Sequence, residues 1–281
     1  MSKISKLGYG IVAFDDTCHL RNILSEIRDQ IDEVVVCLQK LSYHGDPIDE
    51  KVVNYIDKLK SVGLVDDVIW FESTKEYPDD EKRGRLIETD KRNFILDFLE
   101  SKGCSHAMVT DSDEFYDAED FKNAKTLIEN DDNIHLSYCE YVNYYRDYQH
   151  LLVWPFRCYV PFITEINYRF DFEKGNFPKP CDPTRRYLTT PGTDFSIFGY
   201  NVIKMHHLSW IRTDIREKIK NWSARKYFLL DNFYDKIIDR YENYKDGQNA
   251  VILFNAPNNE VCVNKLPFRY INPKYRLDEE L

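Results

Sequence analysis

The chain has 281 residues, of which 43% are hydrophobic and 15% are aromatic, and its formal net charge is −10. This composition excludes a disordered chain, because there is ample apolar surface to bury in a core. No segment approaches the ~20 consecutive apolar residues of a membrane helix, and the acidic balance disfavours a broad nucleic-acid surface while leaving a local basic groove open.

Strand and helix patterns alternate through the first part of the chain. Buried strands are predicted at 8–14, 34–38, 68–71 and from 107 onward. Thr17 is the expected N-cap of the helix after the first strand. Asp46-Pro47 is expected to open a second helix that ends at Gly63, and a long third helix ends at Gly103. This βαβαβαβ order predicts a mostly parallel sheet with right-handed crossovers.

The second half has a different pattern, rich in β-branched and aromatic residues at first and in prolines later. The expected elements are sheet at 134–163, a long loop near a site at 174–192, a helix from Thr213 or Asp214 to about Tyr244, and a short strand at 251–254 followed by a basic tail. No composition shift marks a linker, so a single continuous domain over 1–281 is expected.

The cysteines and the N-terminal residues both bear on the cellular location of the protein. The 7 cysteines are odd in number and scattered without C-x-x-C spacing, which argues against a disulfide framework and a zinc site. The first residues lead into a strand pattern with no small-residue cleavage site, so no signal peptide is expected. A reducing cytoplasm fits best, which for a viral protein means the host cytoplasm; oligomeric state is left open.

Two carboxylates follow the fourth predicted strand in the run Ala107-Met108-Val109-Thr110-Asp111-Ser112-Asp113. On a strand, the i, i+2 spacing puts Asp111 and Asp113 on one face. At the carboxyl edge of a parallel sheet, the pair offers hard oxygen ligands to a divalent cation that bridges to a diphosphate. An isolated D-x-D is more often an acidic turn after a strand, so the neighbouring motifs must decide between a turn and a metal site.

Two further features point to the same chemistry. Lys91 and Arg92, on the helix before the acidic strand, can meet a phosphate or the nucleotide. In the segment His206-His207-Leu208-Ser209-Trp210-Ile211-Arg212, an imidazole can complete the shell of a metal ion and Arg212 can hold a leaving diphosphate. Each feature alone is usually a solvated helix residue or a polar turn, but their joint occurrence in this order favours a metal-assisted diphosphate site.

With these motifs, the chain resembles nucleotide-sugar-dependent glycosyltransferases of the GT-A fold, over roughly the first 115 residues and again at 204–226. The motifs that match are Arg92-Asn93, Asp111-Ser112-Asp113 and His207-Leu208-Ser209-Trp210-Ile211-Arg212. The resemblance implies an α/β fold: a GT-A-like, Rossmann-related, mostly parallel sheet flanked by helices, with a mixed β acceptor-side half and a long C-terminal helix. It divides the single domain into a nucleotide-sugar-binding half, 1–115, and an acceptor-side half, 116–281.

The resemblance also implies site roles and cofactors. Asp113 and His207, in preference to His206, would bind Mn²⁺ or Mg²⁺, while Asp111 would contact the sugar, the ribose or the metal through water. The donor would be a UDP-sugar, with UDP-glucose expected. The acidic residue that many such enzymes carry after the second strand is replaced here by Gln39-Lys40, and Asp15 is the expected substitute for holding the base. The donor-binding set is Phe14, Asp15, Lys91, Arg92, Asp111, Ser112 and Asp113.

Glycosyl transfer needs these residue types because the departing nucleoside diphosphate develops negative charge. A divalent cation and Arg212 neutralise that charge, in place of protonating the leaving group. An inverting enzyme adds a carboxylate base, for which Asp171 and Asp194 are the expected candidates and Glu140 and Glu165 are also available. A retaining enzyme needs no such base, and the sequence leaves both outcomes open.

The acceptor side rests on tyrosines and basic residues. Tyrosines crowd 138–148, where rings can stack on a sugar or an extruded base, although a core edge strand explains them equally well. A basic set around the proposed site favours a phosphate-rich acceptor: Arg185, Arg186, Arg212, Arg216, Lys220, Lys265, Arg269, Lys274 and Arg276. In size and layout, the chain is similar to bacteriophage glycosyltransferases that modify hydroxymethylcytosine, which implies double-stranded DNA carrying glucosylated 5-hydroxymethylcytosine as the acceptor.

Other classes of protein share parts of this pattern. A glycosyltransferase acting on a glycan or a protein is the main alternative. Haloacid-dehalogenase-type phosphatases also use a strand followed by D-x-D, but on their first strand, whereas here three strands precede it. A calcium loop fails because its required sixth-position glycine is Tyr116. A non-catalytic sugar-nucleotide-binding module would use the same pocket without turnover.

Overall fold

The computed structural model describes residues 3–15, 17–153, 157–212, 214–223, 233–251 and 260–265. The strands are β1 (Leu7–Val12), β2 (Glu33–Leu38), β3 (Asp67–Trp70), β4 (His106–Asp111), β5 (Glu114–Phe115), β6 (Leu136–Tyr145), β7 (Asp147–Val153), β8 (Tyr159–Glu165), β9 (Ser196–Ile197), β10 (Lys204–Trp210), β11 (Ala250–Val251) and β12 (Glu260–Lys265). The helices are α1 (Leu20–Ile27), α2 (Glu50–Ser61), α3 (Arg83–Ser101), α4 (Ala118–Glu129), α5 (Ile215–Asn221) and α6 (Phe233–Glu242), with 3-10 turns η1 (Arg28–Gln30) and η2 (Pro183–Arg185).

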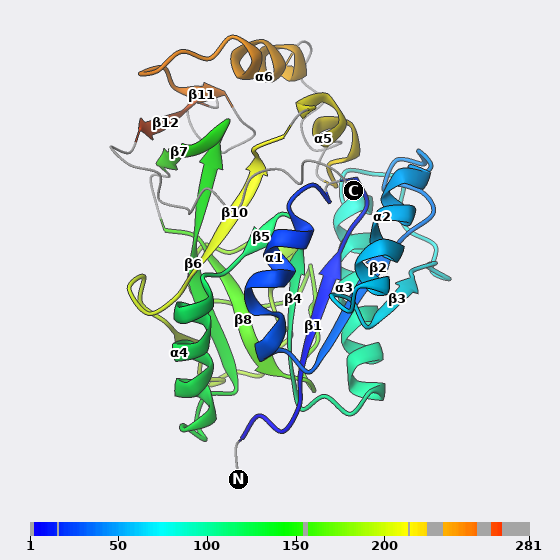
Figure 1. Ribbon diagram of the computed structural model, residues 1–281, viewed down its shortest axis with the longest axis vertical. Helices are drawn as coiled ribbons and strands as arrows, with labels where there is room; N and C mark the ends of the chain where they lie inside the picture. Colours follow the sequence, from blue (N-terminus) through cyan, green and yellow to red (C-terminus); the bar gives the residue numbers. More distant parts are fainter. Residues whose placement is uncertain are drawn as a thin grey trace.

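One continuous sheet runs through the molecule in the order β11-β12-β7-β6-β8-β4-β1-β2-β3, with β10 beside β6 (Figure 1). Strands β3, β2, β1 and β4 pair in parallel, as the alternating helix and strand patterns predicted. From β8 onward the sheet is mixed, because β8 runs antiparallel to β4 and β6 whereas β10 runs parallel to β6. The expected class is confirmed: an α/β sheet, parallel in its first half and mixed in its second, flanked by helices.

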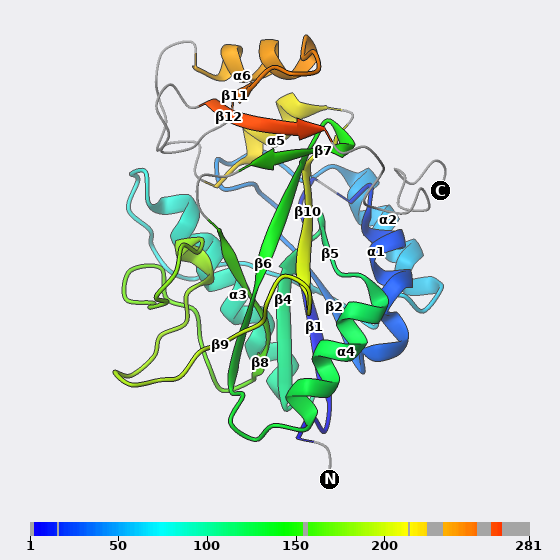
Figure 2. The same ribbon diagram turned by 90° about the vertical axis from the view of Figure 1, so that its left-hand side faces the viewer.

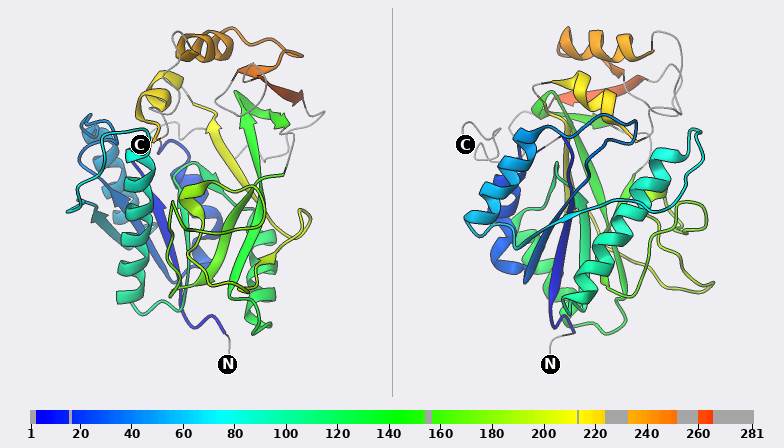
Figure 3. Two further views of the ribbon diagram at one scale, coloured as in Figure 1. Left: turned by 180° about the vertical axis from the view of Figure 1, so that it is seen from behind. Right: turned by 90° about the vertical axis from the view of Figure 1, so that its right-hand side faces the viewer.

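Helices cover both faces of this sheet. Figure 2 shows α1, α2 and α4 along one face, and the views in Figure 3 show α3 and the long loop of 171–195 on the other. Apolar residues from α1, α2 and α4 join one buried cluster, whereas those from α3 join a second cluster with aromatic residues of the long loop. The sheet is therefore the middle layer of three.

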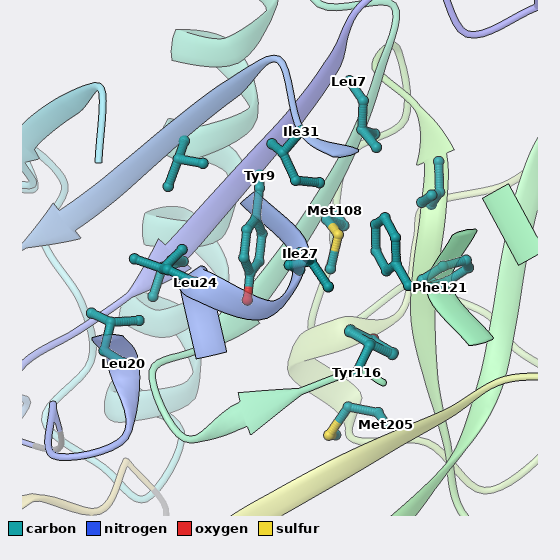
Figure 4. Packing of buried hydrophobic residues seen from close by; sticks show 14 of the residues in the cluster. Leu7, Tyr9, Leu20, Leu24, Ile27, Ile31, Met108, Tyr116, Phe121 and Met205 are labelled. Carbon is teal, nitrogen blue, oxygen red and sulfur yellow. The ribbon is translucent and has the colours of Figure 1, made fainter. Parts of the chain in front are cut away.

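The alternation of side chains along β1 sends a glycine toward α3 and large apolar residues to the other face. Leu7 and Tyr9 point into the cluster under α1 and α4 (Figure 4). Gly10 points toward α3, where an added Cβ would lie 2.1 Å from Cγ2 of Ile95. The missing side chain lets α3 lie close to the sheet, which brings Arg92 of this helix to the end of β4.

A third cluster forms beyond the carboxyl ends of the parallel strands. Tyr145 at the end of β6 and Trp210 at the end of β10 pack with apolar residues of α5, α6 and β11. Strand β12 adds to the sheet by pairing antiparallel with β7. Figure 1 shows these elements gathered above the tips of β1 and β10, so they lie over the edge of the sheet where the acidic motif ends.

Three predicted boundaries were wrong. The first helix begins at Leu20, and its N-cap residue is His19 rather than Thr17. The second helix begins at Glu50 rather than at Pro47, because Pro47 bridges back to Leu41 and the Asp49 carboxylate caps the helix instead.

The expected helix from Thr213 or Asp214 to Tyr244 is also not continuous. Asp214 caps α5, which ends at Asn221 because Trp222 is extended, and α6 is a separate helix. Residues 252–254 of the expected last strand and the tail beyond 265 lie outside the described residues.

Two of the composition-based expectations can be compared with the structure. No helix among the described residues is long and apolar enough to cross a membrane. Within the same part of the chain the cysteines are free thiols: Cys18, Cys37, Cys104, Cys139, Cys158 and Cys181.

Candidate active site

The carboxyl ends of the parallel strands meet at one level of the sheet. Val12 of β1 pairs with Cys37 of β2 on one side and with Asp111 of β4 on the other. A cavity of about 360 Å³ opens there, between these strand ends and β10. Its charged and polar wall residues are Asp15, Gln39, Tyr43, Glu88, Asp111, Ser112, Asp113, Tyr141, Asn143, Asp182, Arg185, His207, Ser209, Arg212, Lys218, Asn221 and Ser223.

The acidic motif turns the chain instead of continuing as a strand. Strand β4 ends at Asp111, Ser112 and Asp113 form a turn, and the chain reverses into β5. Strand β5 runs antiparallel to β10, which sets Glu114 opposite His207. The prediction that Asp111 and Asp113 share one face of a strand is therefore wrong, and the two carboxylates meet different partners.

Asp111 is held by two arginines. Its Oδ1 accepts from Arg92 Nη2 at 2.8 Å and its Oδ2 accepts from Arg185 Nη2 at 2.5 Å. Both guanidinium groups are buried, and Arg92 also pairs with Glu88 one turn earlier in α3. Burial alone would raise the pKa of Asp111, but Arg92 and Arg185 outweigh it and lower the pKa below its ordinary value.

Asp113 is 4% exposed and its two oxygens differ. Oδ2 accepts from Arg212 Nη2 at 3.2 Å. Oδ1 is buried without a hydrogen-bond partner among the described residues, and it lies 3.5 Å from His207 Nε2. Burial opposes ionisation here, yet His207 and Arg212 hold the pKa of Asp113 well below its usual range. The site thus keeps a buried carboxylate oxygen ready to coordinate a cation.

The neighbouring strand fixes the orientation of His207. Its Nδ1 lies 2.6 Å from Oδ1 of Asn143 on β6, as assigned from the hydrogen-bond network. An amide oxygen only accepts, so Nδ1 donates to Asn143, and Nε2 is the ring nitrogen that faces Asp113. With Nδ1 held by Asn143, Nε2 is the nitrogen that would coordinate a metal ion.

His206 points the other way. Its ring stacks on Phe115 with 4.6 Å between centroids, and its Nδ1 lies 2.8 Å from the hydroxyl of Tyr144. Burial lowers its pKa to about 3, so it is a neutral core residue. The alternation of side chains along β10 therefore brings His207, and not His206, into the cavity.

The donor set of the site fits a hard divalent cation. Ligand atoms of Asp113, Glu114 and His207 lie within 4.8 Å of one another. Two carboxylates and one imidazole suit Mn²⁺ or Mg²⁺, and the unpartnered Asp113 Oδ1 is an orphaned atom that such an ion would satisfy. Burial raises the pKa of Glu114 although Arg185 opposes this effect.

The remaining residues expected at the site are only partly brought together. Phe14 and Asp15 line the cavity, and Asp15 accepts from Nδ2 of Asn221 at 2.9 Å. Lys91 is fully buried, with Nζ donating to the carbonyl of Ala13 at 3.3 Å. Neither Lys91 nor Arg92 belongs to the described wall of the cavity.

The carboxylates expected as candidate bases lie elsewhere. Asp171 accepts from backbone N–H groups of its own loop, and Asp194 is exposed. Glu140 pairs with Arg157, and Glu165 lies 2.8 Å from His135. Neither Asp171 nor Asp194 is among the described residues that line the cavity.

Several wall residues were not predicted for this site. Asn143 and Gln39 each had a signal, since a polar residue that alternates inward in an apolar strand, or directly follows one, usually has a partner. Lys218 gave no such signal, because only the tertiary fold brings α5 to the cavity. Arg185 was expected to meet an acceptor phosphate, but it binds Asp111 and Glu114 instead. The Lys218 ammonium donates to Ser209 and lies 5.4 Å from the ring centroid of Trp210.

A second cavity of about 960 Å³ adjoins the first at the ends of β2 and β3. Gln39 and Tyr43 line both cavities. The side chain of Gln39 is buried, and its Oε1 has no hydrogen-bond partner among the described residues. Phe71 and Tyr77 add aromatic wall to the second cavity, so it can take a flat polar ring next to the acidic site.

Comparison with known proteins identifies no family. No protein-family model matches the chain, and no curated protein matches it. Among solved structures, S. aureus TarS aligns over 72% of this chain and 36% of that chain, with 11% identity and a TM-score of 0.41. A glycosyltransferase involved in the glycosylation of the major capsid of PBCV-1 aligns over 48% of this chain and 51% of that chain, with 13% identity and a TM-score of 0.23.

The chain therefore spans 36% and 51% of the lengths of these two proteins. At these TM-scores, neither likeness bears on the function of this chain. The chemistry of the cavity has to carry that inference.

Proposed function

We propose that the protein is a glycosyltransferase that moves a sugar from a nucleoside-diphosphate donor to an acceptor hydroxyl with the help of Mn²⁺ or Mg²⁺. The observation that carries the proposal is the pairing of Asp113 Oδ1 with His207 Nε2, 3.5 Å apart at the carboxyl edge of a parallel sheet. In open α/β sheets, ligands bind at this edge. The sequence resemblance agrees, because the same two residues match its motifs.

Each residue of the site has a task in such a reaction. Asp113 and His207 would hold the cation, which when bound neutralises the charge of the diphosphate. Arg212 contacts Asp113 and lies 3.7 Å from Asp15, so its guanidinium spans the opening where the leaving group would develop charge. Asp111 is already satisfied by Arg92 and Arg185, which gives it the task of fixing those cations under the diphosphate.

The donor's base would lie toward the second cavity. The unpartnered Oε1 of Gln39 would accept a hydrogen bond from an N–H donor, such as the imide of a uracil. The ring of Tyr43 would stack on the base. A UDP-sugar is therefore the first donor class to test, with UDP-glucose first. Asp15 stays within reach of the ribose on the cavity side.

The acceptor is less constrained. Tyr141, Trp210 and Trp222 line the cavity and suit stacking on a sugar ring. A modified-DNA acceptor loses support at Arg185, which is buried against Asp111 and Glu114 and cannot meet an outside phosphate. Arg216 pairs with Glu242 and Lys220 with Asp46. The transfer assay should therefore compare three acceptor classes: glycans, proteins and DNA that carries glucosylated 5-hydroxymethylcytosine.

A phosphatase of the dehalogenase type is disfavoured by the same geometry. Its nucleophile would be Asp111, the first acid of the motif, but both oxygens of that carboxylate are bound by buried arginines. A nucleophile needs an open approach to the phosphorus atom. Asp111 also ends β4 rather than the first strand of the chain.

A thermal-shift panel tests the donor class. UDP-glucose, other nucleotide sugars and free UDP are compared with and without Mn²⁺, because only true ligands stabilise the native state by mass action. We expect a UDP-sugar to raise the melting temperature in the presence of Mn²⁺ and to do so weakly after EDTA. Stabilisation by simple phosphoesters, with none by nucleotide sugars, would contradict the proposal.

A further inference from the structure

One oxygen of the candidate metal site is shared with an arginine. Oε1 of Glu114 forms an ion pair with Arg185 Nη2, and the same atom lies 4.0 Å from His207 Nε2. Arg185 also donates from Nη1 to Glu114 Oε2 at 2.8 Å and from Nη2 to Asp111 Oδ2 at 2.5 Å. Both oxygens of Glu114 and Oδ2 of Asp111 are thus bound by the Arg185 guanidinium, while Oδ1 of Asp111 is bound by Arg92.

The fold holds Arg185 firmly in this position. It is 6% exposed and closes the 3-10 turn Pro183–Arg185. Asp182 caps that turn by accepting from the backbone N–H of Thr184 at 2.8 Å. The Thr184 hydroxyl lies 3.3 Å from Glu88, which joins the turn to α3. The guanidinium is therefore positioned by two elements, and it does not swing freely from the long loop.

We propose that Arg185 is a built-in competitor of the divalent cation, which restricts the ion to Asp113 and His207 and sets a weak affinity for it. The inference rests on the proposed metal-dependent function. A guanidinium occupies the oxygens that a cation needs and adds a like charge next to it, and both effects weaken cation binding. A weakly held ion matches a reaction in which the diphosphate supplies the missing oxygen ligands and takes the cation with it.

Titration with Mn²⁺ alone at pH 8 tests the idea, by calorimetry or by the EPR signal of free Mn²⁺. The Arg185→Met variant releases both oxygens of Glu114 and Oδ2 of Asp111 from the guanidinium, so we expect Mn²⁺ to bind at least tenfold more tightly than to the wild type. Arg186→Met is the matched control, because Arg186 sits on the same turn and donates to the carbonyl of Cys181. Its Mn²⁺ affinity should equal that of the wild type.

A double-mutant cycle assigns the gain to Glu114. Glu114→Gln alone should weaken Mn²⁺ binding, because it leaves the charge of Arg185 less compensated, whereas adding it to Arg185→Met should remove most of the gain. Arg185→Lys keeps the charge but loses the two-carboxylate contact, and we expect about threefold tighter binding. This variant carries the test if the methionine variant does not fold.

The outcomes separate this inference from the proposed function. Mn²⁺ binding by the wild type with no gain in either Arg185 variant would overturn the competitor role and leave the metal site standing. A gain that persists in full when Glu114→Gln is added to Arg185→Met would also overturn it, since the released Glu114 carboxylate would then not bind the ion. No Mn²⁺ binding by any variant, with or without UDP, would overturn both.

Discussion

His207 and Asn143 form the contact that orients the site, with Nδ1 of the imidazole 2.6 Å from the amide oxygen. The two residues are direct neighbours in the parallel pairing of β10 with β6. Register therefore fixes the contact, and a shift of either strand by one residue would turn His207 into the core and His206 into the cavity. The orientation of the imidazole is a property of the sheet, not of a loop.

Substituting Asn143 should weaken metal binding without removing a ligand. In Asn143→Leu, the imidazole loses the acceptor that holds its proton on Nδ1, so we expect Mn²⁺ affinity to fall about 10- to 100-fold. Calorimetric titration with Mn²⁺ measures the change, and Asn133→Leu, at an exposed turn, serves as the control. Unchanged affinity in Asn143→Leu would mean that the ring is oriented by other contacts.

Substitutions of the two aspartates of the motif should differ in their effect on stability and on transfer. Asp111→Asn leaves the buried guanidiniums of Arg92 and Arg185 without full compensation, so the free energy of unfolding should drop by about 3 kcal/mol. In Asp113→Asn, Arg212 can still donate to the amide oxygen and keeps Asp15 3.7 Å away, so the change should cost only about 1 kcal/mol while abolishing transfer. Urea denaturation and a transfer assay on both variants check this contrast. Equal stability losses would show that Asp113 is as structural as Asp111.

The close approach of α3 to β1 should make Gly10 sensitive to a single methyl group. In Gly10→Ala the new Cβ would lie 2.1 Å from Cγ2 of Ile95, a β-branched side chain that cannot swing away. We expect a loss of about 1–3 kcal/mol in unfolding free energy. Gly199→Ala, where no atom lies within 4 Å of the added Cβ, is the matched control. Similar stability in the two variants would contradict the tight packing of α3.

Histidine burial should make stability depend on pH. Burial lowers the pKa of His106 from 6.5 to about 4, so the folded state resists its protonation while the unfolded chain does not. The contribution of the neutral ring is fully present above pH 6.5 and is lost as the pH falls toward 4, with a slope of up to about 1.4 kcal/mol per pH unit.

The variant His106→Leu isolates this contribution. Its unfolding free energy should vary less steeply than that of the wild type between pH 4 and 6.5, because one titrating group is removed. Urea denaturation at a series of pH values measures both slopes. Identical slopes would show that His106 takes up its proton equally in both states.

The parallel half of the fold could be predicted from the sequence because its strands and helices each have a local hydrophobic pattern. Buried strands and amphipathic helices alternate there, and glycines stand where helices end, as Gly63 and Gly103 do with positive φ. The break at Trp222 could not be predicted, because the apolar and basic periodicity continues across it. Tertiary packing decides such a break, with the carbonyl of Trp222 lying 2.8 Å from Nε2 of His44.

The candidate site also has residues that the sequence predicts and residues that only the tertiary fold brings together. Asp113, His207 and Arg212 belong to short motifs whose residue types predict metal and diphosphate binding. The fold brings these three residues together. The partners of Asp111 could not be read from the chain, since Arg185 lies 74 residues away in a proline-rich loop. The D-x-D motif predicted two carboxylates on one face of a strand, but the turn after β4 separates them into a structural carboxylate, Asp111, and a cation-facing one, Asp113.

The central claim is tested most directly by the rate of UDP release from UDP-sugars in the presence of the acceptor panel. We predict release that requires Mn²⁺ or Mg²⁺, stops with EDTA and is lost in Asp113→Asn, although that variant keeps its fold. Release that persists at full rate in EDTA or in Asp113→Asn would contradict a cation-assisted reaction at this site. An absence of release from every nucleotide sugar, by a protein that still binds UDP, would make the protein a binding module rather than an enzyme.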